Sequence, residues 1–182
     1  MAQTWRVATG QRERDRPPLD RAALDRLAID YVGRYATTRA KLRAYLERKL
    51  KERGWADETP PEPDVIVGRL AAAGYVDDRL FAAQRSASLV RRGYGRARVG
   101  LALRAAGIDA DDAAPALEEA GDSAWAAAEA FAKRRRIGPF SREPGDPDQR
   151  RKAFAAMLRA GHPPEIARLF VAAEPGEMPE RD

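Results

Sequence analysis

The sequence predicts an all-α protein, built as an elongated tandem array of three three-helix repeats. Apolar residues recur at intervals of three and four positions along most of the chain, which is the period of an amphipathic helix. Three similar segment ends, Gly54-Trp55, Gly107-Ile108 and Gly161-His162, place their glycines 53 and 54 residues apart. A period of this length is typical of repeat proteins, in which each unit packs mainly against its neighbours.

This period divides the chain into five parts. The ranges are 1–18 for a disordered N-terminal tail, 19–74, 75–121 and 122–173 for the three repeats, and 174–182 for an acidic C-terminal tail. The N-terminal tail ends in Pro17-Pro18 and shows no helical stripe, which favours disorder.

The first repeat contains signals for three helices. Asp20 can cap the first helix, and Thr37 or Thr38 can cap the second. Because proline is tolerated in a first helical turn, we expect the third helix to begin near Pro63 and to end at Gly74. The first helix places on one face Leu24, Leu27, Ala28, Tyr31 and Tyr35.

The second and third repeats are expected to contain three helices each. The predicted ranges are 78–92, 95–106 and 110–120, then 122–136, 147–160 and 163–173. Pro115 lies inside one of them and predicts a late start or a kink. The loop over 137–147 is rich in glycine and proline, so we expect a hinge or a mobile connection there. The buried stripe expected along 78–92 is Leu80, Ala83, Ala87 and Val90.

Charge is sorted along the second repeat. Between Arg79 and Ile108 there are seven arginines and no acid, whereas residues 109–122 carry six acids and no base. The whole chain has a net charge of +5. This clustering favours a polyanionic partner such as a nucleic acid.

Ten residues are therefore candidates for contact with a partner protein or with DNA. They are Arg85, Arg91, Arg92, Tyr94, Arg96, Arg98, Lys133, Arg134, Arg135 and Arg136. The alternative is a solvated face, and the basic run 133–136 could also serve to stabilise a helix C-terminus through its dipole.

Several other conspicuous residues are expected to be structural. We expect Tyr75, Phe81 and Trp125 to anchor the core, because each stands on an apolar stripe or beside a turn. Asp77 and Asp78 should cap the helix that begins near residue 78.

We find no set of residues that predicts catalysis, a metal or a cofactor. The single histidine, His162, precedes two prolines at a helix start and is explained as a buried turn residue. Asp109 and its neighbours resemble a calcium loop, but Ala114 and Ala120 stand where glycine and the closing carboxylate are needed. We therefore expect a non-enzyme.

The chain contains no cysteine and no run of eighteen apolar residues. The first observation fits a reducing compartment, and the second predicts no membrane span or export signal. We expect a soluble, cytoplasmic protein.

Three motifs in order carry a resemblance to a known family. Residues 74–82 (GYVDDRLFA), residues 91–99 (RRGYGRARV) and Gly107-Ile108 are similar to the signature of the bacterial RecX family, the regulators of the RecA recombinase. The resemblance extends less tightly over 19–173. Residues 59–63 resemble an insertion relative to that family.

The resemblance implies a function and a partner. Proteins of this family lie in the deep groove of the RecA filament on single-stranded DNA. They inhibit its ATPase, its strand exchange and its co-protease activity, and so act in DNA repair, recombination and the SOS response. For this chain the resemblance implies RecA and single-stranded DNA as partners, with DNA contacted directly or through RecA, as a monomer without a cofactor.

Two other functions are compatible with the residues alone. One is direct DNA binding by an architectural or transcriptional helical protein, which predicts duplex affinity that falls steeply with salt. The other is a helical scaffold whose arginines only keep it in solution.

Overall fold

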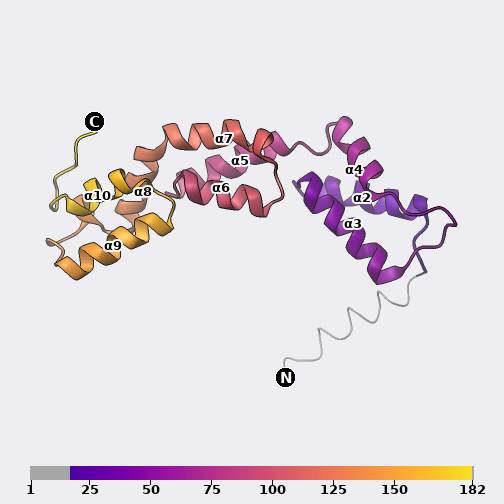
Figure 1. The fold of residues 1–182 in the computed structure, drawn as a ribbon, viewed down its shortest axis with the longest axis horizontal. Helices are drawn as coiled ribbons and strands as arrows, with labels where there is room; N and C mark the ends of the chain where they lie inside the picture. The colour runs from indigo at the N-terminus through magenta and orange to yellow at the C-terminus, as the bar shows by residue number, and fades with distance from the viewer. Residues whose placement is uncertain (1–16, 182) are drawn as a thin grey trace, which may run out of the picture. The chain divides into compact units, whose positions relative to one another are not determined.

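The computed structural model describes residues 17–181, and every regular element within that range is helical (Figure 1). The prediction of an all-α protein is confirmed. The predicted tail over 1–18 lies outside the described residues, apart from Pro17 and Pro18. The chain divides by its internal contacts into two compact units, Met1–Asp78 and Arg79–Asp182.

The first unit contains three helices, and their caps are those expected from the sequence. The Asp20 carboxylate accepts a hydrogen bond from the N–H of Ala23 at 2.6 Å, and the Thr38 hydroxyl accepts one from the N–H of Lys41 at 3.2 Å. Such side chains satisfy N–H groups that have no partner within the helix. The helices are α2 (Arg21–Arg34), α3 (Arg39–Arg53) and α4 (Pro63–Ala72).

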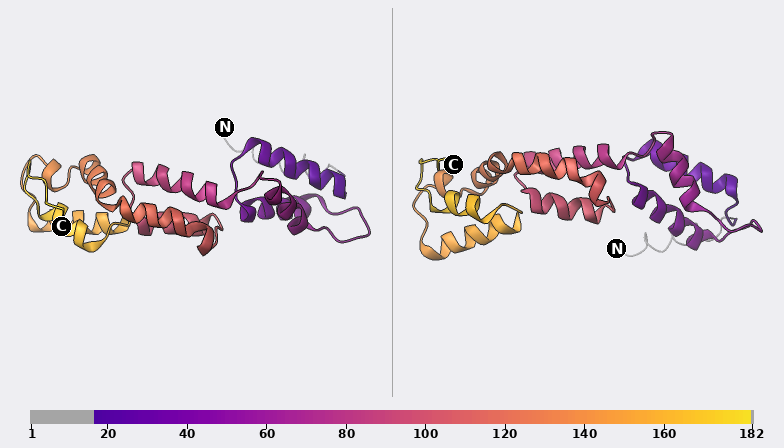
Figure 2. Two further views of the ribbon diagram at one scale, coloured as in Figure 1. Left: turned by 90° about the horizontal axis from the view of Figure 1, so that it is seen from above. Right: turned by 45° about the horizontal axis from the view of Figure 1, so that its top comes forward.

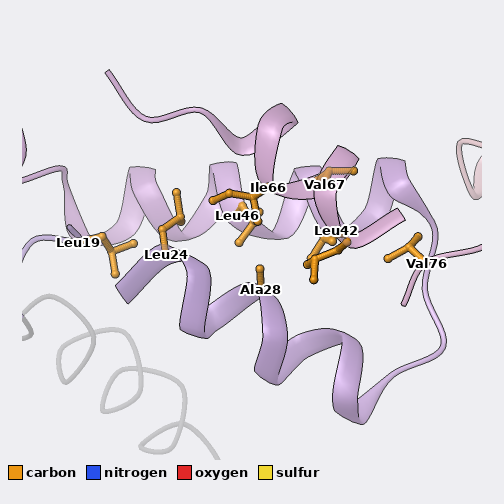
Figure 3. Close-up of a cluster of buried hydrophobic side chains, with 9 residues drawn as sticks. Leu19, Leu24, Ala28, Leu42, Leu46, Ile66, Val67 and Val76 are labelled. Carbon is orange, nitrogen blue, oxygen red and sulfur yellow. The ribbon is translucent and has the colours of Figure 1, made fainter. Parts of the chain in front are cut away.

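A compact apolar core holds these helices together (Figure 3). Leu42 and Leu46 of α3 are fully buried between α2 and α4. Each buried leucine contributes about 1.5–3 kcal/mol relative to an exposed one. Leu19 joins the core from outside the helices, and its N–H donates to the carbonyl of Gly54 at 3.0 Å.

The second unit contains the remaining helices (Figures 1 and 2). α6 lies beside α7, and α10 lies beside α9. The elements are α5 (Asp78–Arg91), α6 (Arg96–Ala105), α7 (Ala110–Asp122), α8 (Ala124–Arg135), η1 (Gly138–Phe140), α9 (Pro147–Arg159) and α10 (Pro164–Ala172). α7 starts at the expected position and continues through Pro115.

Small residues dominate the core among α5, α6 and α7. The buried apolar side chains are Ala82, Leu89, Val99, Leu103, Ala106, Ile108, Ala113, Ala116 and Ala120. On α5 the expected stripe is wrong by about one position, because Leu80 is 55% exposed while Ala82 and Ser86 are buried. The buried face of α5 was not recognised in the sequence because it includes the polar residue Ser86. The Ser86 hydroxyl donates to the carbonyl of Ala116 at 3.0 Å.

Larger side chains form the core of α8, α9 and α10. Met157 and Phe170 are fully buried, and Trp125 packs on Phe170 with ring centroids 5.1 Å apart. Trp125 and Phe81 are therefore the core anchors that we predicted, both partly buried against a core cluster. Tyr75 is not, because its side chain is 67% exposed.

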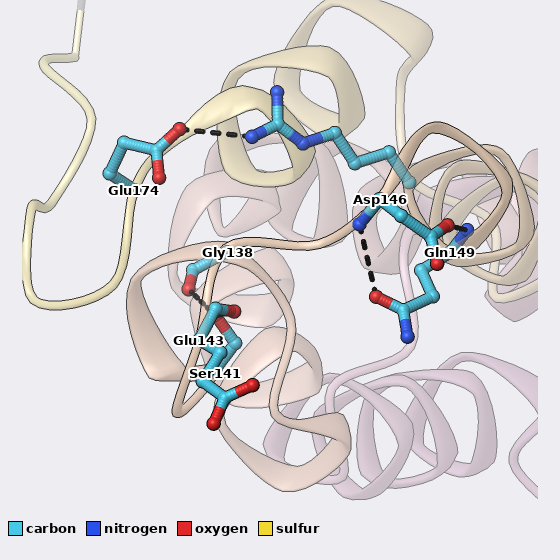
Figure 4. A network of polar contacts seen from close by, with 7 residues as sticks. Gly138, Ser141, Glu143, Asp146, Gln149 and Glu174 are labelled. Carbon is cyan, nitrogen blue, oxygen red and sulfur yellow. Dashed lines mark hydrogen bonds and ion pairs between the residues drawn. The ribbon is translucent and has the colours of Figure 1, made fainter.

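The loop over 137–147, where we expect a hinge or mobile connection, contains several local hydrogen bonds (Figure 4). The Ser141 hydroxyl donates to the carbonyl of Gly138 at 2.7 Å, and Asp146 and Gln149 form a reciprocal capping box at the start of α9. In the first residues of the C-terminal tail, Glu174 pairs with Arg150 at 2.9 Å.

Candidate partner-binding surface

The ten candidate residues all belong to the second unit. Arg85 and Arg91 lie on α5, and Arg96 and Arg98 lie in the first turn of α6. Arg92 and Tyr94 lie in the turn between these helices, and the basic run 133–136 ends α8. The nine basic side chains are exposed, and Tyr94 is partly buried.

The turn over 93–95 closes α5 through backbone hydrogen bonds. The N–H of Tyr94 donates to the carbonyl of Leu89 at 3.0 Å, and the N–H of Gly93 donates to the carbonyl of Val90 at 2.8 Å. Gly93 has a φ of +77°, the left-handed conformation that this type of C-cap requires.

The same turn docks against the turn between α9 and α10. The N–H of Gly95 donates to the carbonyl of Ala160 at 2.9 Å, and the N–H of Ala97 donates to the carbonyl of Gly161 at 3.3 Å. A Cβ added at Gly95 would lie 2.2 Å from the Gly161 oxygen, so only glycine permits this approach. Since these contacts occupy N–H groups at the start of α6, that helix end does not offer them to a phosphate.

His162 is part of this junction. The side chain is 4% exposed, and its Nε2 lies 3.1 Å from the carbonyl of Gly93, to which it can only donate. Burial lowers the pKa of His162 below its ordinary value, the positive charge of Arg134 lowers it further, and the bond to Gly93 opposes them. The lowered pKa favours the neutral imidazole at pH 7, and the burial of His162 agrees with the structural role expected from the sequence.

Three candidates from two parts of the sequence meet beside the junction. The guanidinium carbons of Arg92 and Arg134 each lie 5.7 Å from the ring centroid of Tyr94. That of Arg134 also lies 5.4 Å from the ring of Phe131, and Arg134 donates to the carbonyl of Arg92. These distances are typical of cation–π interactions, so two positively charged side chains contact one tyrosine ring.

Within residues 17–181, the other candidate residues make no cation–π contact with the Tyr94 ring. Arg96 donates from Nε to the carbonyl of Leu117 at 3.1 Å and lines a groove between α6 and α7. Arg135 and Arg136 line a separate groove of about 400 Å³, together with Arg150. The candidate residues therefore form a spread cationic surface and not a single pocket.

Among the described residues, ion pairs with carboxylates are found at several basic side chains, but not at these nine. Within residues 17–181, none of the nine basic candidates pairs with a carboxylate, whereas Arg79 pairs with Asp112 at 3.0 Å and Arg69 with Asp25 at 2.6 Å. Their charges are thus available to an anionic partner. We call this set the unpaired basic surface: Arg85, Arg91, Arg92, Arg96, Arg98, Lys133, Arg134, Arg135 and Arg136.

Sequence reasoning missed an aromatic group in the first unit. Tyr31 of α2 stacks on Tyr45 of α3 with centroids 4.2 Å apart, and Tyr35 lies 5.3 Å from Tyr31. We assigned Tyr31 and Tyr35 to the buried face of α2, yet Tyr35 is 58% exposed. The signal available in the sequence was the i, i+4 spacing of these two tyrosines beside Arg34.

Two further properties bear on the class of protein. Between residues 17 and 181 no helix is long and apolar enough to cross a membrane. In the same range no group of three or more His, Cys, Asp or Glu residues could hold a metal ion. Fold and surface together define an all-helical protein with a cationic surface.

Comparison with known proteins identifies the family. Residues 77–117 match the family model of the second three-helix domain of RecX. Regulatory protein RecX of Mycolicibacterium vanbaalenii is 32% identical over 163 residues, covering 81% of this chain and 82% of that protein. Regulatory protein RecX of Myxococcus xanthus is 29% identical over 156 residues, covering 81% and 83%.

Solved structures agree with this assignment at the level of the fold. The crystal structure of RecX from Lactobacillus salivarius has a TM-score of 0.61 at 18% identity, covering 83% of this chain and 94% of that one. A second crystal structure of regulatory protein RecX has a TM-score of 0.62 at 20% identity. The chain belongs to the RecX family of regulatory proteins.

Proposed function

We propose that this protein binds the RecA filament on single-stranded DNA in the cytoplasm and inhibits its ATPase, strand-exchange and co-protease activities. Membership of the RecX family supports a regulatory role. The observation in this chain that supports an anionic partner is the unpaired basic surface, in which none of nine exposed cations is neutralised within residues 17–181.

The proposed mechanism is multivalent binding along a polymer. Three-helix units present cations that meet acidic RecA surface or the DNA backbone at successive RecA subunits. Many weak contacts on one filament act together, because each contact raises the effective concentration of the next. The bound protein then obstructs filament growth or the subunit motions that accompany ATP hydrolysis.

The test is the steady-state ATPase rate of RecA on single-stranded DNA with this protein added well below one molecule per RecA. We expect strong inhibition at a large excess of DNA over what the added protein could cover. Inhibition only when the protein saturates free DNA would contradict the proposal and favour direct DNA binding without RecA.

Charge variants connect the inhibition to the surface. Replacing Arg85, Arg91 and Arg92 by alanine should weaken inhibition and flatten its dependence on salt, because fewer counterions are released. A matched control removes three charges from the same unit at Arg142, Arg151 and Lys152, of which the last two pair with Asp148. Equal effects of both triple variants would show that net charge and not this surface matters.

A further inference from the structure

The tyrosine group of the first unit lies outside the unpaired basic surface and has its own architecture. Tyr31 and Tyr45 stack with an interplanar angle of 21°, and both pack partly against the core of the unit. Tyr35 extends this row, inclined by 51° to Tyr31. Tyr35 is not among the residues packed on the core, and the residue as a whole is 58% exposed. The row of three tyrosines therefore ends in one exposed residue, Tyr35.

Cations line the same groove. Its volume is about 470 Å³, and its walls come from α2, α3 and the start of their connection. The guanidinium carbon of Arg48 lies 5.5 Å from the ring centroid of Tyr45. The lining residues are Leu27, Asp30, Tyr31, Arg34, Tyr35, Tyr45, Arg48 and Lys49.

The charge of the groove is partly balanced. Glu52 pairs with Lys49 at 2.8 Å and with Arg48 at 3.6 Å, and Asp30 adds one carboxylate to the lining. The lining thus includes three cations, Arg34, Arg48 and Lys49, and one carboxylate, Asp30. Arg34 follows Tyr31 by three residues and directly precedes Tyr35, so one cation stands beside the open ring.

We propose that this groove binds single-stranded nucleic acid, with a base stacked on Tyr35 and phosphates close to Arg34 and Arg48. An exposed aromatic face beside basic side chains is the combination that nonspecific single-strand binders use. Duplex DNA does not fit this mode, because its bases already stack on one another. The inference concerns the same strand as the proposed function but does not require RecA.

Two probes separate stacking from charge. The full chain is titrated, without RecA, into a fluorescently labelled thymidine oligonucleotide and into an abasic oligonucleotide of equal length. The protein used in these titrations carries Arg85→Ala, Arg91→Ala and Arg92→Ala, so that the second unit contributes less to the binding of the oligonucleotide. We expect the thymidine strand to bind about five- to tenfold more tightly than the abasic strand, from one stacked base.

Variants of Tyr35 test the ring itself. Tyr35→Ala should abolish the preference for the thymidine strand and leave binding of the abasic strand within about twofold, since only the stacking face is lost. Tyr35→Phe should keep the preference. The control is Tyr75→Ala, which removes an exposed tyrosine of the same unit outside the groove and should change neither affinity.

Arg34→Ala tests the phosphate contact. It should weaken binding of both strands and reduce the slope of log affinity against log salt by about 0.7, the value for one phosphate on a single strand. A Tyr35→Ala protein that retains the thymidine preference would overturn the inference. So would Tyr35-dependent binding of a polyglutamate peptide with no binding of either oligonucleotide, which would mark a protein-binding surface.

The two proposals fail separately. If the protein does not inhibit RecA but binds the thymidine strand more tightly than the abasic strand, only the proposed function is contradicted. If the protein inhibits RecA but Tyr35→Ala does not change the preference for the thymidine strand, only the proposal of nucleic-acid binding in the groove is contradicted. Thermal unfolding of Tyr35→Ala should match that of the parent, because the exposed ring contributes little to the core.

Discussion

The Asp78 carboxylate accepts a hydrogen bond from the backbone N–H of Arg39 at 3.0 Å. Arg39 is the first residue of α3, so this carboxylate places a negative charge at the positive end of that helix. Asp78 is only 4% exposed. An acid in the motif that resembles the RecX signature thus stabilises α3 of the first unit.

Asp78→Ala should therefore destabilise the first unit. The Arg39 N–H would lose a buried acceptor, at a cost of about 1–3 kcal/mol in the free energy of unfolding. Hydrogen exchange of the α3 amides measures this locally. Asp77→Ala is the control, because Asp77 is exposed, and it should change exchange little. Equal effects of both substitutions would contradict the role given to Asp78.

Gly95→Ala should disrupt the junction within the second unit. A Cβ at this position would lie 2.2 Å from the Gly161 oxygen, which forces the two turns apart. The expected loss is about 1–3 kcal/mol in the free energy of unfolding, measured by urea denaturation. Gly100→Ala is the matched control, since its Cβ would make only an ordinary contact 3.5 Å from Leu117, and should not destabilise the protein.

Stability should depend on pH through His162. Its pKa is lower in the folded protein than in the unfolded chain, so the unfolded chain binds more protons as pH falls below about 6.5. The stability of the second unit is therefore fully present above this pH and declines below it. Thermal unfolding at pH 7.5 and pH 5.5 should show a fall in Tm for the parent protein.

The substitution His162→Ile isolates this effect, because Ile108 occupies the corresponding turn of the second repeat. The variant should be less stable at pH 7.5, since the Gly93 carbonyl loses its donor, by about 1 kcal/mol. Its Tm should nevertheless fall less between pH 7.5 and pH 5.5. An undiminished fall would assign the pH dependence to other groups.

Arg136→Gly should remove a charge of the unpaired basic surface without harming the fold. Arg136 has a φ of +54° and caps α8 in the left-handed conformation. That conformation costs a residue with a side chain about 1–2 kcal/mol and glycine much less. We expect a Tm equal to or above that of the parent, with weaker inhibition of RecA. Arg136→Ala serves as the comparison, because it removes the same charge and keeps the strain.

Helix positions could be predicted because their signals are local. The cap at Asp20, the proline at the start of α4 and the apolar period each depend on a few neighbouring residues. The buried face of α5 could not be predicted, because it includes Ser86, a polar residue that sequence patterns assign to the exposed face. In the structure the Ser86 hydroxyl donates to the carbonyl of Ala116. The exposure of Tyr75 also depends on tertiary packing.

The candidate surface was predictable in composition but not in arrangement. Its cations were visible as arginines without neighbouring acids, and within residues 17–181 they remain unpaired. No local pattern indicated that Arg92 and Arg134 would share one tyrosine ring. That contact requires the turn over 93–95 to dock on a segment synthesised much later.

This docking constrains how the protein is made. His162 and Gly93 are separated by 69 positions in the chain, and the alanine-rich core between α5 and α7 offers little apolar area before they meet. During translation the turn over 93–95 is synthesised before residues 160–162. The N–H groups of Gly95 and Ala97 that later bond to Ala160 and Gly161 are hydrated until then, so the folding of this turn is completed only after that later segment has been made.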